Sequence, residues 1–301
     1  MWTPFSGDLR LALRSLRRHP GFSAAVAVTL ALAVGANGAI FAVVRAVLLR
    51  DLPFAEASRL VALQARQVGD DHLPFSIPDF LDLASAKTLD GVVGWSGWSA
   101  NLTGVEAPVR IQAQWATRGF FELLGIHAAL GRTPTAQEQA PGAAHVALLS
   151  DGLWRTRFGA DPAILGRNLT LNGESFAVIG ILPPEFPFLS ANAQLIAPLI
   201  LETDARRSKR GAAFLRVIAR LREGSSLAAA RAELNGIAAR LRSSYPETNG
   251  ASVGVAAVPL TESVVGGYRA MLLLLQGAAV LVLLIACMNL ANLLLARVLA
   301  R

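Results

Sequence analysis

The chain has 301 residues, of which 53% are hydrophobic, and it carries a formal net charge of +7. This composition is unusually apolar for a soluble globular protein, so membrane-crossing stretches are expected. The positive charge is spread along the chain apart from one group near the N-terminus, which argues against a nucleic-acid-binding protein. The single cysteine, Cys287, lies in an apolar run, so no disulfide is expected in the rest of the chain.

Residues 1–21 are predicted to form an amphipathic helix on the cytoplasmic surface of the membrane. Phe5, Leu9 and Leu13 fall on one helical face, and arginines occupy the other. This pattern is typical of a helix that lies in the membrane interface, and an unstructured basic tail is the alternative. The arginines are expected to anchor the topology by staying in the cytoplasm: Arg10, Arg14, Arg17 and Arg18.

Residues 22–44 form the first of two charge-free stretches and are predicted to be a transmembrane helix. Their 23 residues exceed the roughly 20 that cross a bilayer core. A cleaved secretory signal is the alternative, but the apolar stretch is long for a signal core and no clean Ala-x-Ala site follows it. Gly35, Asn37 and Gly38 are expected to pack against other helices, because small and amide side chains suit close contact in lipid. A polar translocation path is the alternative role for such residues.

Residues 45–270 are predicted to fold outside the membrane as an α+β domain. Apolar and polar residues alternate over 109–115 and 215–222, which indicates strands. Asn172-Gly173 separates two further strand-like runs and predicts a hairpin with a type I′ turn. Ser226 is expected to cap a helix that runs through Leu241 and stops at Tyr245-Pro246. Shorter helices are expected at Pro78–Ala86, Gly119–Leu124 and Asp151–Phe158, and a mobile loop at Glu202–Gly211.

The order of these elements suggests how the outer domain is organised. Two β-α-β stretches, about 59–117 and 214–258, are expected to pair into one ferredoxin-like subdomain. The block between them, about 118–212, would then be a second subdomain inserted into the first.

Residues 271–296 form the second charge-free stretch, which runs for 26 residues and is predicted to be the second transmembrane helix. Asn289 and Asn292 within it are also expected to pack against other helices. Arg297 and Arg301 follow it, and positive flanks stay in the cytoplasm, so both ends of the chain are expected inside. Residues 297–301 would begin a cytoplasmic segment.

The motifs of common catalytic sites are missing from the sequence. There is no Gly-Lys-Ser/Thr of a phosphate-binding loop, no His-Glu-x-x-His and no Gly-x-Ser-x-Gly. We therefore expect no enzyme, and no catalytic, cofactor-binding or metal-binding residue. Asp70-Asp71-His72 is interpreted as a solvated loop rather than a metal site. Trp95 and Trp98 are interpreted as core residues, with stacking on a ligand as the alternative.

Four stretches of the chain resemble a known family. They read LALAVGANGAIFAVVRAVLLRDLPFAEASRL at 30–60, TRGFFELLGIHAALGRT at 117–133, LNGESFAVIGILPPEF at 171–186 and LVLLIACMNLANLLLAR at 281–297. Together they resemble the permease subunits of MacB/FtsX-type ABC transporters, in particular MacB-like and acidobacterial duplicated permeases. The resemblance covers nearly the whole chain in the expected order.

The resemblance implies a fold, a location and a function. Members have a first helix, a large periplasmic domain with a porter-like and an inserted subdomain, and three further helices, in the cell inner membrane. A separate ATPase subunit binds ATP, and the permease transmits its motion to the periplasmic domain by mechanotransmission. The expected activity is efflux of a hydrophobic or peptide-like substrate, with a second permease copy and a periplasmic adaptor as partners. Because this chain ends before the later helices, it is expected to be a fragment of a longer permease.

Other functions fit parts of the pattern. A double-pass membrane sensor also places an outer domain between two helices, and a signalling helix after residue 301 would favour it. Within the family, lipoprotein release and regulation of cell-wall hydrolases are the closer alternatives, which neighbouring genes would distinguish.

Overall fold

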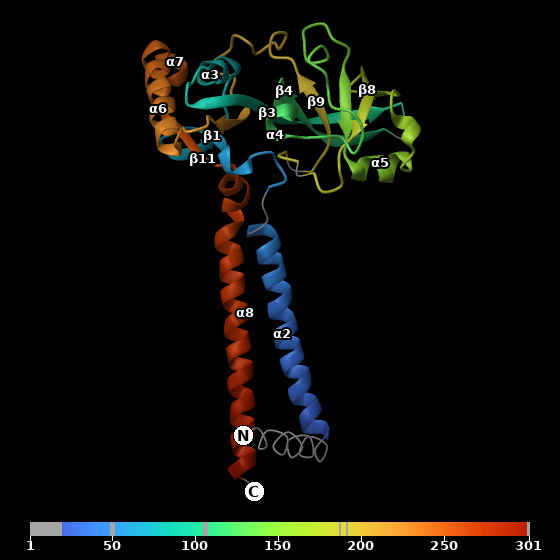
Figure 1. Ribbon diagram of the computed structural model, residues 1–301, viewed down its shortest axis with the longest axis vertical. Coiled ribbons are helices and arrows are strands. Elements are labelled where there is room, and N and C mark those ends of the chain that lie inside the picture. Colours follow the sequence, from blue (N-terminus) through green and yellow to red (C-terminus); the bar gives the residue numbers. More distant parts are fainter. Residues whose placement is uncertain (1–19, 49–51, 105–107, 187, 191, 300–301) are drawn as a thin grey trace. The chain divides into compact units, whose positions relative to one another are not determined.

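The computed structural model describes residues 20–48, 52–104, 108–186, 188–190 and 192–299 (Figure 1). The chain divides into two compact units, one made of 1–50 with 265–301 and the other of 51–264. The helix predicted over 1–21 lies outside the described residues except for its last two positions. The anchor residues Arg10, Arg14, Arg17, Arg18 and Arg301 also lie outside them.

The first unit contains two long helices, α2 (Pro20–Leu48) and α8 (Leu260–Leu299), which run side by side (Figure 1). Their most apolar windows are Ala27–Arg45 and Ala270–Asn292, with mean hydropathies of 2.1 and 2.6. By length and composition, both helices could cross a membrane. The helix α8 begins eleven residues before the charge-free stretch that predicted it, and its first five residues belong to the second unit.

The second unit is a mixed α/β domain built on one hydrogen-bonded sheet. Four of its strands are antiparallel to their neighbours and lie in the order β11-β1-β10-β3. These are β1 (Leu60–Gln67), β3 (Leu89–Thr103), β10 (Arg216–Leu221) and β11 (Ser252–Pro259). The short β2 (Asp70–Leu73) pairs with β1.

The sheet continues from β3 into a closed barrel. From β3 the pairing runs through β4, β9, β6, β8 and β7, and β7 returns to β3, so six strands close on themselves within the described residues. The fifteen-residue β3 therefore belongs to both parts of the sheet. The new strands are β4 (Val109–Thr117), β6 (Val146–Leu149), β7 (Asn168–Leu171), β8 (Glu174–Ile181) and β9 (Ala193–Leu199), and β5 (Leu130–Gly131) pairs with β8.

The hairpin predicted at Asn172-Gly173 is confirmed. Leu171 lies opposite Glu174 in the β7–β8 pair. The backbone angle φ is 52° at Asn172 and 88° at Gly173. A type I′ turn needs positive φ at both central residues, which asparagine and glycine tolerate best.

Helices cover one face of the four-stranded part. The predicted long helix is confirmed as α6 (Leu227–Ser244), and the Ser226 hydroxyl accepts a hydrogen bond from the Ala229 amide as its N-cap. It packs with α3 (Ile77–Leu83) on the apolar side chains of β1, β10 and β11. The remaining helical segments are α4 (Phe120–Leu124), α5 (Asp151–Phe158), α7 (Pro246–Asn249), η1 (Ala57–Arg59) and η2 (Pro162–Ile164).

The free edge of the sheet, at β11, is covered by side chains of α6. The Asn235 carboxamide accepts a hydrogen bond from the Val255 amide at 3.0 Å and donates one to the Val255 carbonyl at 3.3 Å. The Arg231 guanidinium donates to the Ala257 carbonyl at 2.7 Å. These contacts satisfy outward-facing groups of the strand, so this stretch of the edge is not free to pair with another strand.

Three apolar clusters form the core of the second unit. The first lies between the four-stranded part and α3 with α6, and the third fills the barrel. The second lies on the opposite face of the four-stranded part, where Phe120 and Phe121 are in edge-to-face contact. Leu260, the first residue of α8, belongs to this second cluster and is 2% exposed.

Candidate functional site

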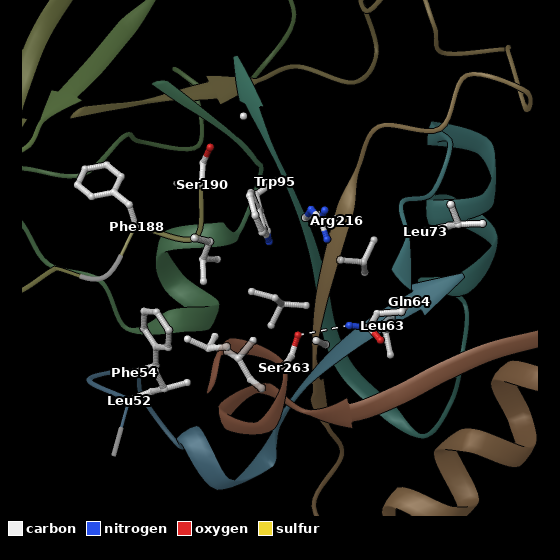
Figure 2. Close-up of a pocket in the computed structure, with 17 residues that line it drawn as sticks. Leu52, Phe54, Leu63, Gln64, Leu73, Trp95, Phe188, Ser190, Arg216 and Ser263 are labelled. Carbon is white, nitrogen blue, oxygen red and sulfur yellow. Dashed lines mark hydrogen bonds between the residues drawn. The ribbon is translucent and has the colours of Figure 1, made fainter. Parts of the chain in front are cut away.

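A groove of about 450 Å³ lies next to the first turns of α8, within the second unit (Figure 2). Seventeen residues line it, and they include one charged residue, Arg216, and no acid. The volume falls within the range of small-molecule sites, roughly 300–1,000 Å³. The apolar walls come from three parts of the chain, the segment before η1 (Leu52, Phe54), the loop after β8 (Phe188, Leu189) and the start of α8 (Leu260, Val264).

Strand pairing places Arg216 beside Trp95 in this groove. The two residues lie directly opposite each other in the β10–β3 pair, so their side chains share one face of the sheet. The Arg216 guanidinium lies 5.8 Å from the centre of the Trp95 ring, and Figure 2 shows the two side chains next to each other. This is a cation–π contact. The alternation over 215–222 predicted that Arg216 faces away from Leu215 and Val217, but it did not identify the partner strand.

Polar groups from β1 and α8 meet at another part of the groove. The Gln64 amide donates to the Ser263 hydroxyl at 3.4 Å (Figure 2). The His72 Nδ1 atom lies 3.0 Å from the Gln64 Oε1 atom. Gln64 and Ser263 line the groove. The groove therefore presents amide and hydroxyl groups besides the guanidinium.

A buried glutamine fixes the loop that forms the opposite wall. The Oε1 atom of Gln114 accepts hydrogen bonds from the Leu189 amide at 3.1 Å and the Ser190 amide at 2.9 Å. Gln114 is fully buried, and its Nε2 atom has no hydrogen-bond partner among the described residues. A Cβ atom at Gly97 would lie 2.4 Å from the Ser190 hydroxyl, so the loop approaches β3 this closely only because position 97 is glycine.

The residues predicted to mediate helix packing have different environments. The Asn37 amide donates to the Ala279 carbonyl of α8 at 2.6 Å, which ties the two long helices together. Gly35 and Gly38 are exposed, with open space where a Cβ atom would lie. Asn289 and Asn292 are exposed as well. Packing of these four against helices of another chain stays a prediction. Arg297 lies within α8, and its role as an anchor also stays a prediction.

Trp95 and Trp98 point to opposite faces of β3. Trp95 packs against the second apolar cluster and lines the groove. Trp98 packs at the edge of the barrel core, stacked on Trp115 with 4.4 Å between ring centres. Three residues along a strand reverse the side of the sheet, so the two tryptophans cannot form one stacking platform.

The described residues contain no group of three or more His, Cys, Asp or Glu side chains that could hold a metal ion. In the Asp70-Asp71-His72 segment, the Asp71 carboxylate pairs with Arg66 at 2.8 Å. That ion pair lowers the pKa of Asp71, chiefly through the hydrogen bond from Arg66.

A mixed α/β domain between two helices that could cross a membrane is the arrangement of a membrane protein with a large domain outside the lipid. More specifically, the model of the MacB-like periplasmic core domain matches residues 23–237, so the chain belongs to this family of ABC transporter permeases. The resemblance seen in the four sequence stretches is thereby confirmed. The domain is the periplasmic part of a membrane permease, and the permeases of this family are generally non-catalytic.

The solved structures that are similar to the chain include two permease domains. One is a domain of a putative permease protein from Porphyromonas gingivalis, with 16% identity, 68% of this chain and 92% of that chain covered, and a TM-score of 0.52. The other is the periplasmic region of MacB from Actinobacillus actinomycetemcomitans, with 14% identity, 69% of this chain and 91% of that chain covered, and a TM-score of 0.51. At this level of identity the two structures support the fold alone. A comparison with curated proteins gives no match.

Proposed function

We propose that the chain acts in the cell inner membrane as a permease subunit that couples ATP hydrolysis by a separate ATPase to movement of its periplasmic domain. This movement drives efflux of a hydrophobic or peptide-like substrate. Family membership supports the class of transporter. The cofactor ATP belongs to the ATPase subunit, and a second permease copy and a periplasmic adaptor complete the assembly.

The observation that carries the proposal is the continuity of α8. Its 40 residues run without interruption from Leu260 to Leu299 and correspond to a length of about 60 Å, at a rise of roughly 1.5 Å per residue. Leu260 is buried in the core of the periplasmic domain, whereas Ala270–Asn292 is apolar enough to span the bilayer. A displacement of the cytoplasmic end would therefore reach the domain core through one continuous helix.

The arrangement of strands supports a ferredoxin-like, porter-like subdomain. The order β11-β1-β10-β3, with α3 between β1 and β3 and α6 between β10 and β11, is that of a β-α-β-β-α-β unit. The inserted subdomain, about 118–212, then supplies most of the barrel, to which β3 and β4 also contribute. In this proposal the groove beside α8 receives the substrate, because its walls are largely apolar.

Coupling predicts that nucleotide changes the geometry of two periplasmic domains. The test uses the full-length permease with its ATPase in lipid nanodiscs, with Cys287→Ser and a single Val68→Cys, since Val68 is 89% exposed. Cross-linking with bifunctional maleimides should give a different yield with a non-hydrolysable ATP analogue than with ADP. An ATPase variant that cannot bind nucleotide is the control. Equal yields in all nucleotide states, for several lengths of cross-linker, would contradict the proposal.

A further inference from the structure

We infer that the groove beside α8 binds an amphipathic anion, with its oxyanion head at Arg216 and its hydrocarbon part against the apolar walls. This inference rests on the proposed function, since it names the chemical class of molecule that the permease handles. It is carried by the charge, the polarity and the arrangement of the residues that line the groove.

The charge of Arg216 lacks a counter-ion within the described residues. Among the described residues its guanidinium has no hydrogen bond or ion pair, and it contacts the Trp95 ring. The neighbouring arginines Arg59 and Arg220 both pair with Glu56, and Arg220 does so at 3.4 Å. The lining of the groove contains no acid. Arg216 is exposed, so its guanidinium is accessible to an oxyanion, which it can bind through two parallel hydrogen bonds.

The surroundings of Arg216 separate a polar from an apolar region. Ser263 and Gln64 supply hydroxyl and amide groups that can donate to an oxyanion, whereas Ser190 lies on the Phe188 side of Trp95 (Figure 2). Leu52, Phe54 and Phe188 gather on the opposite side of Trp95 from Arg216 (Figure 2). A ligand that filled the groove would place a charged head and an apolar body on these two sides, as an amphiphile with a single acyl chain does. A cationic amphiphile would instead place its charge against Arg216.

The ring of Trp95 allows binding to be measured at the site itself. The full chain is reconstituted in nanodiscs of phosphatidylcholine and titrated with 12-bromododecanoate, whose bromine quenches nearby tryptophan. The signal of a Trp95→Phe variant is subtracted to isolate Trp95 from the other four tryptophans. We expect saturable quenching, with a dissociation constant that rises roughly tenfold or more in Arg216→Gln and less in Arg216→Lys. Arg110→Gln, an exposed arginine outside the groove, is the matched control and should bind as the unaltered chain does.

Two further probes separate specific binding from partition into lipid. A 12-bromododecyl trimethylammonium ion should give no saturable quenching of Trp95. The Val264→Trp variant should block the groove and so abolish saturable quenching of Trp95 by the anion. Because this variant adds a tryptophan, its signal is corrected by subtracting that of the same variant with Trp95→Phe. Equal affinity of the unaltered chain and Arg216→Gln, or equal quenching by the anion and the cation, would overturn the inference. Nucleotide-dependent cross-linking tests the proposed coupling, whereas tryptophan quenching tests anion binding. The two results are independent, so either proposal can fail while the other holds.

Discussion

Replacing Leu260 with alanine should lower the free energy of unfolding of the periplasmic domain by about 2–5 kcal/mol. Leu260 is 2% exposed and packs in the cluster that contains Phe54 and Phe120. Truncation leaves a cavity where α8 enters the domain core, so the helix should also transmit motion less effectively. The expected functional result is a smaller difference in cross-linking yield between nucleotide states. Chemical denaturation followed by tryptophan fluorescence measures the stability.

Leu274→Ala is the matched control for this experiment. It makes the same change in the same helix, but the Leu274 side chain is 75% exposed in this chain. Its effect on unfolding of the periplasmic domain should be within about 0.5 kcal/mol, as for most substitutions outside a core. Equal effects of the two variants, or full coupling in Leu260→Ala despite the loss of stability, would mean that the buried end of α8 is not the mechanical connection.

Replacing Arg210 with methionine should be the most destabilising change of a charged residue in the domain, at about 3–5 kcal/mol. The Arg210 guanidinium lies 2.6 Å from the Asp79 carboxylate and 2.7 Å from that of Asp82, and it covers the Tyr245 ring at 3.9 Å. Burial lowers the pKa of Arg210, but hydrogen bonds to Asp82 and Asp79 outweigh it and raise the pKa above its ordinary value. An arginine side chain is charged at any ordinary pH. Its removal leaves Asp79, whose side chain is 13% exposed, without its counter-ion.

Arg207→Met is the control, because Arg207 is exposed and belongs to the same loop. It should change stability little. The double variant Arg210→Met with Asp79→Asn should recover part of the loss, since a neutral amide needs no counter-ion in that position. Denaturation of the four proteins under one set of conditions gives the result. Equal stability of the unaltered chain and Arg210→Met would contradict the account of this cluster.

Local structure in the sequence predicted much of the fold. The turn at Asn172-Gly173, the N-cap at Ser226 and the helix at Asp151–Phe158 follow from short-range chemistry, and all three are confirmed. The two charge-free stretches likewise predicted the long helices, because length and hydropathy suffice for that purpose.

Contacts between distant segments could not be predicted in the same way. The barrel closes because β7 pairs with β3 across about 70 residues of sequence, and alternation within a strand does not name its partner. For the same reason the sequence could not predict that Arg216 contacts Trp95, or that Arg210 pairs with Asp79. Glu202–Gly211 was predicted to be mobile from its charge alone. In the structure Arg206 bonds to Asp204 and Arg210 bonds to Asp79 of α3, and the mobility itself stays a prediction.

The location of residues 51–264 outside the membrane is the claim on which the rest of the account depends. It is tested by labelling intact spheroplasts with a membrane-impermeant maleimide, comparing a chain that carries Val68→Cys and Cys287→Ser with one that keeps only Cys287. We expect rapid labelling at position 68 and none at Cys287, which lies within the apolar window Ala270–Asn292. Labelling at position 68 only after permeabilisation, or ready labelling of Cys287 in the intact membrane, would contradict the account.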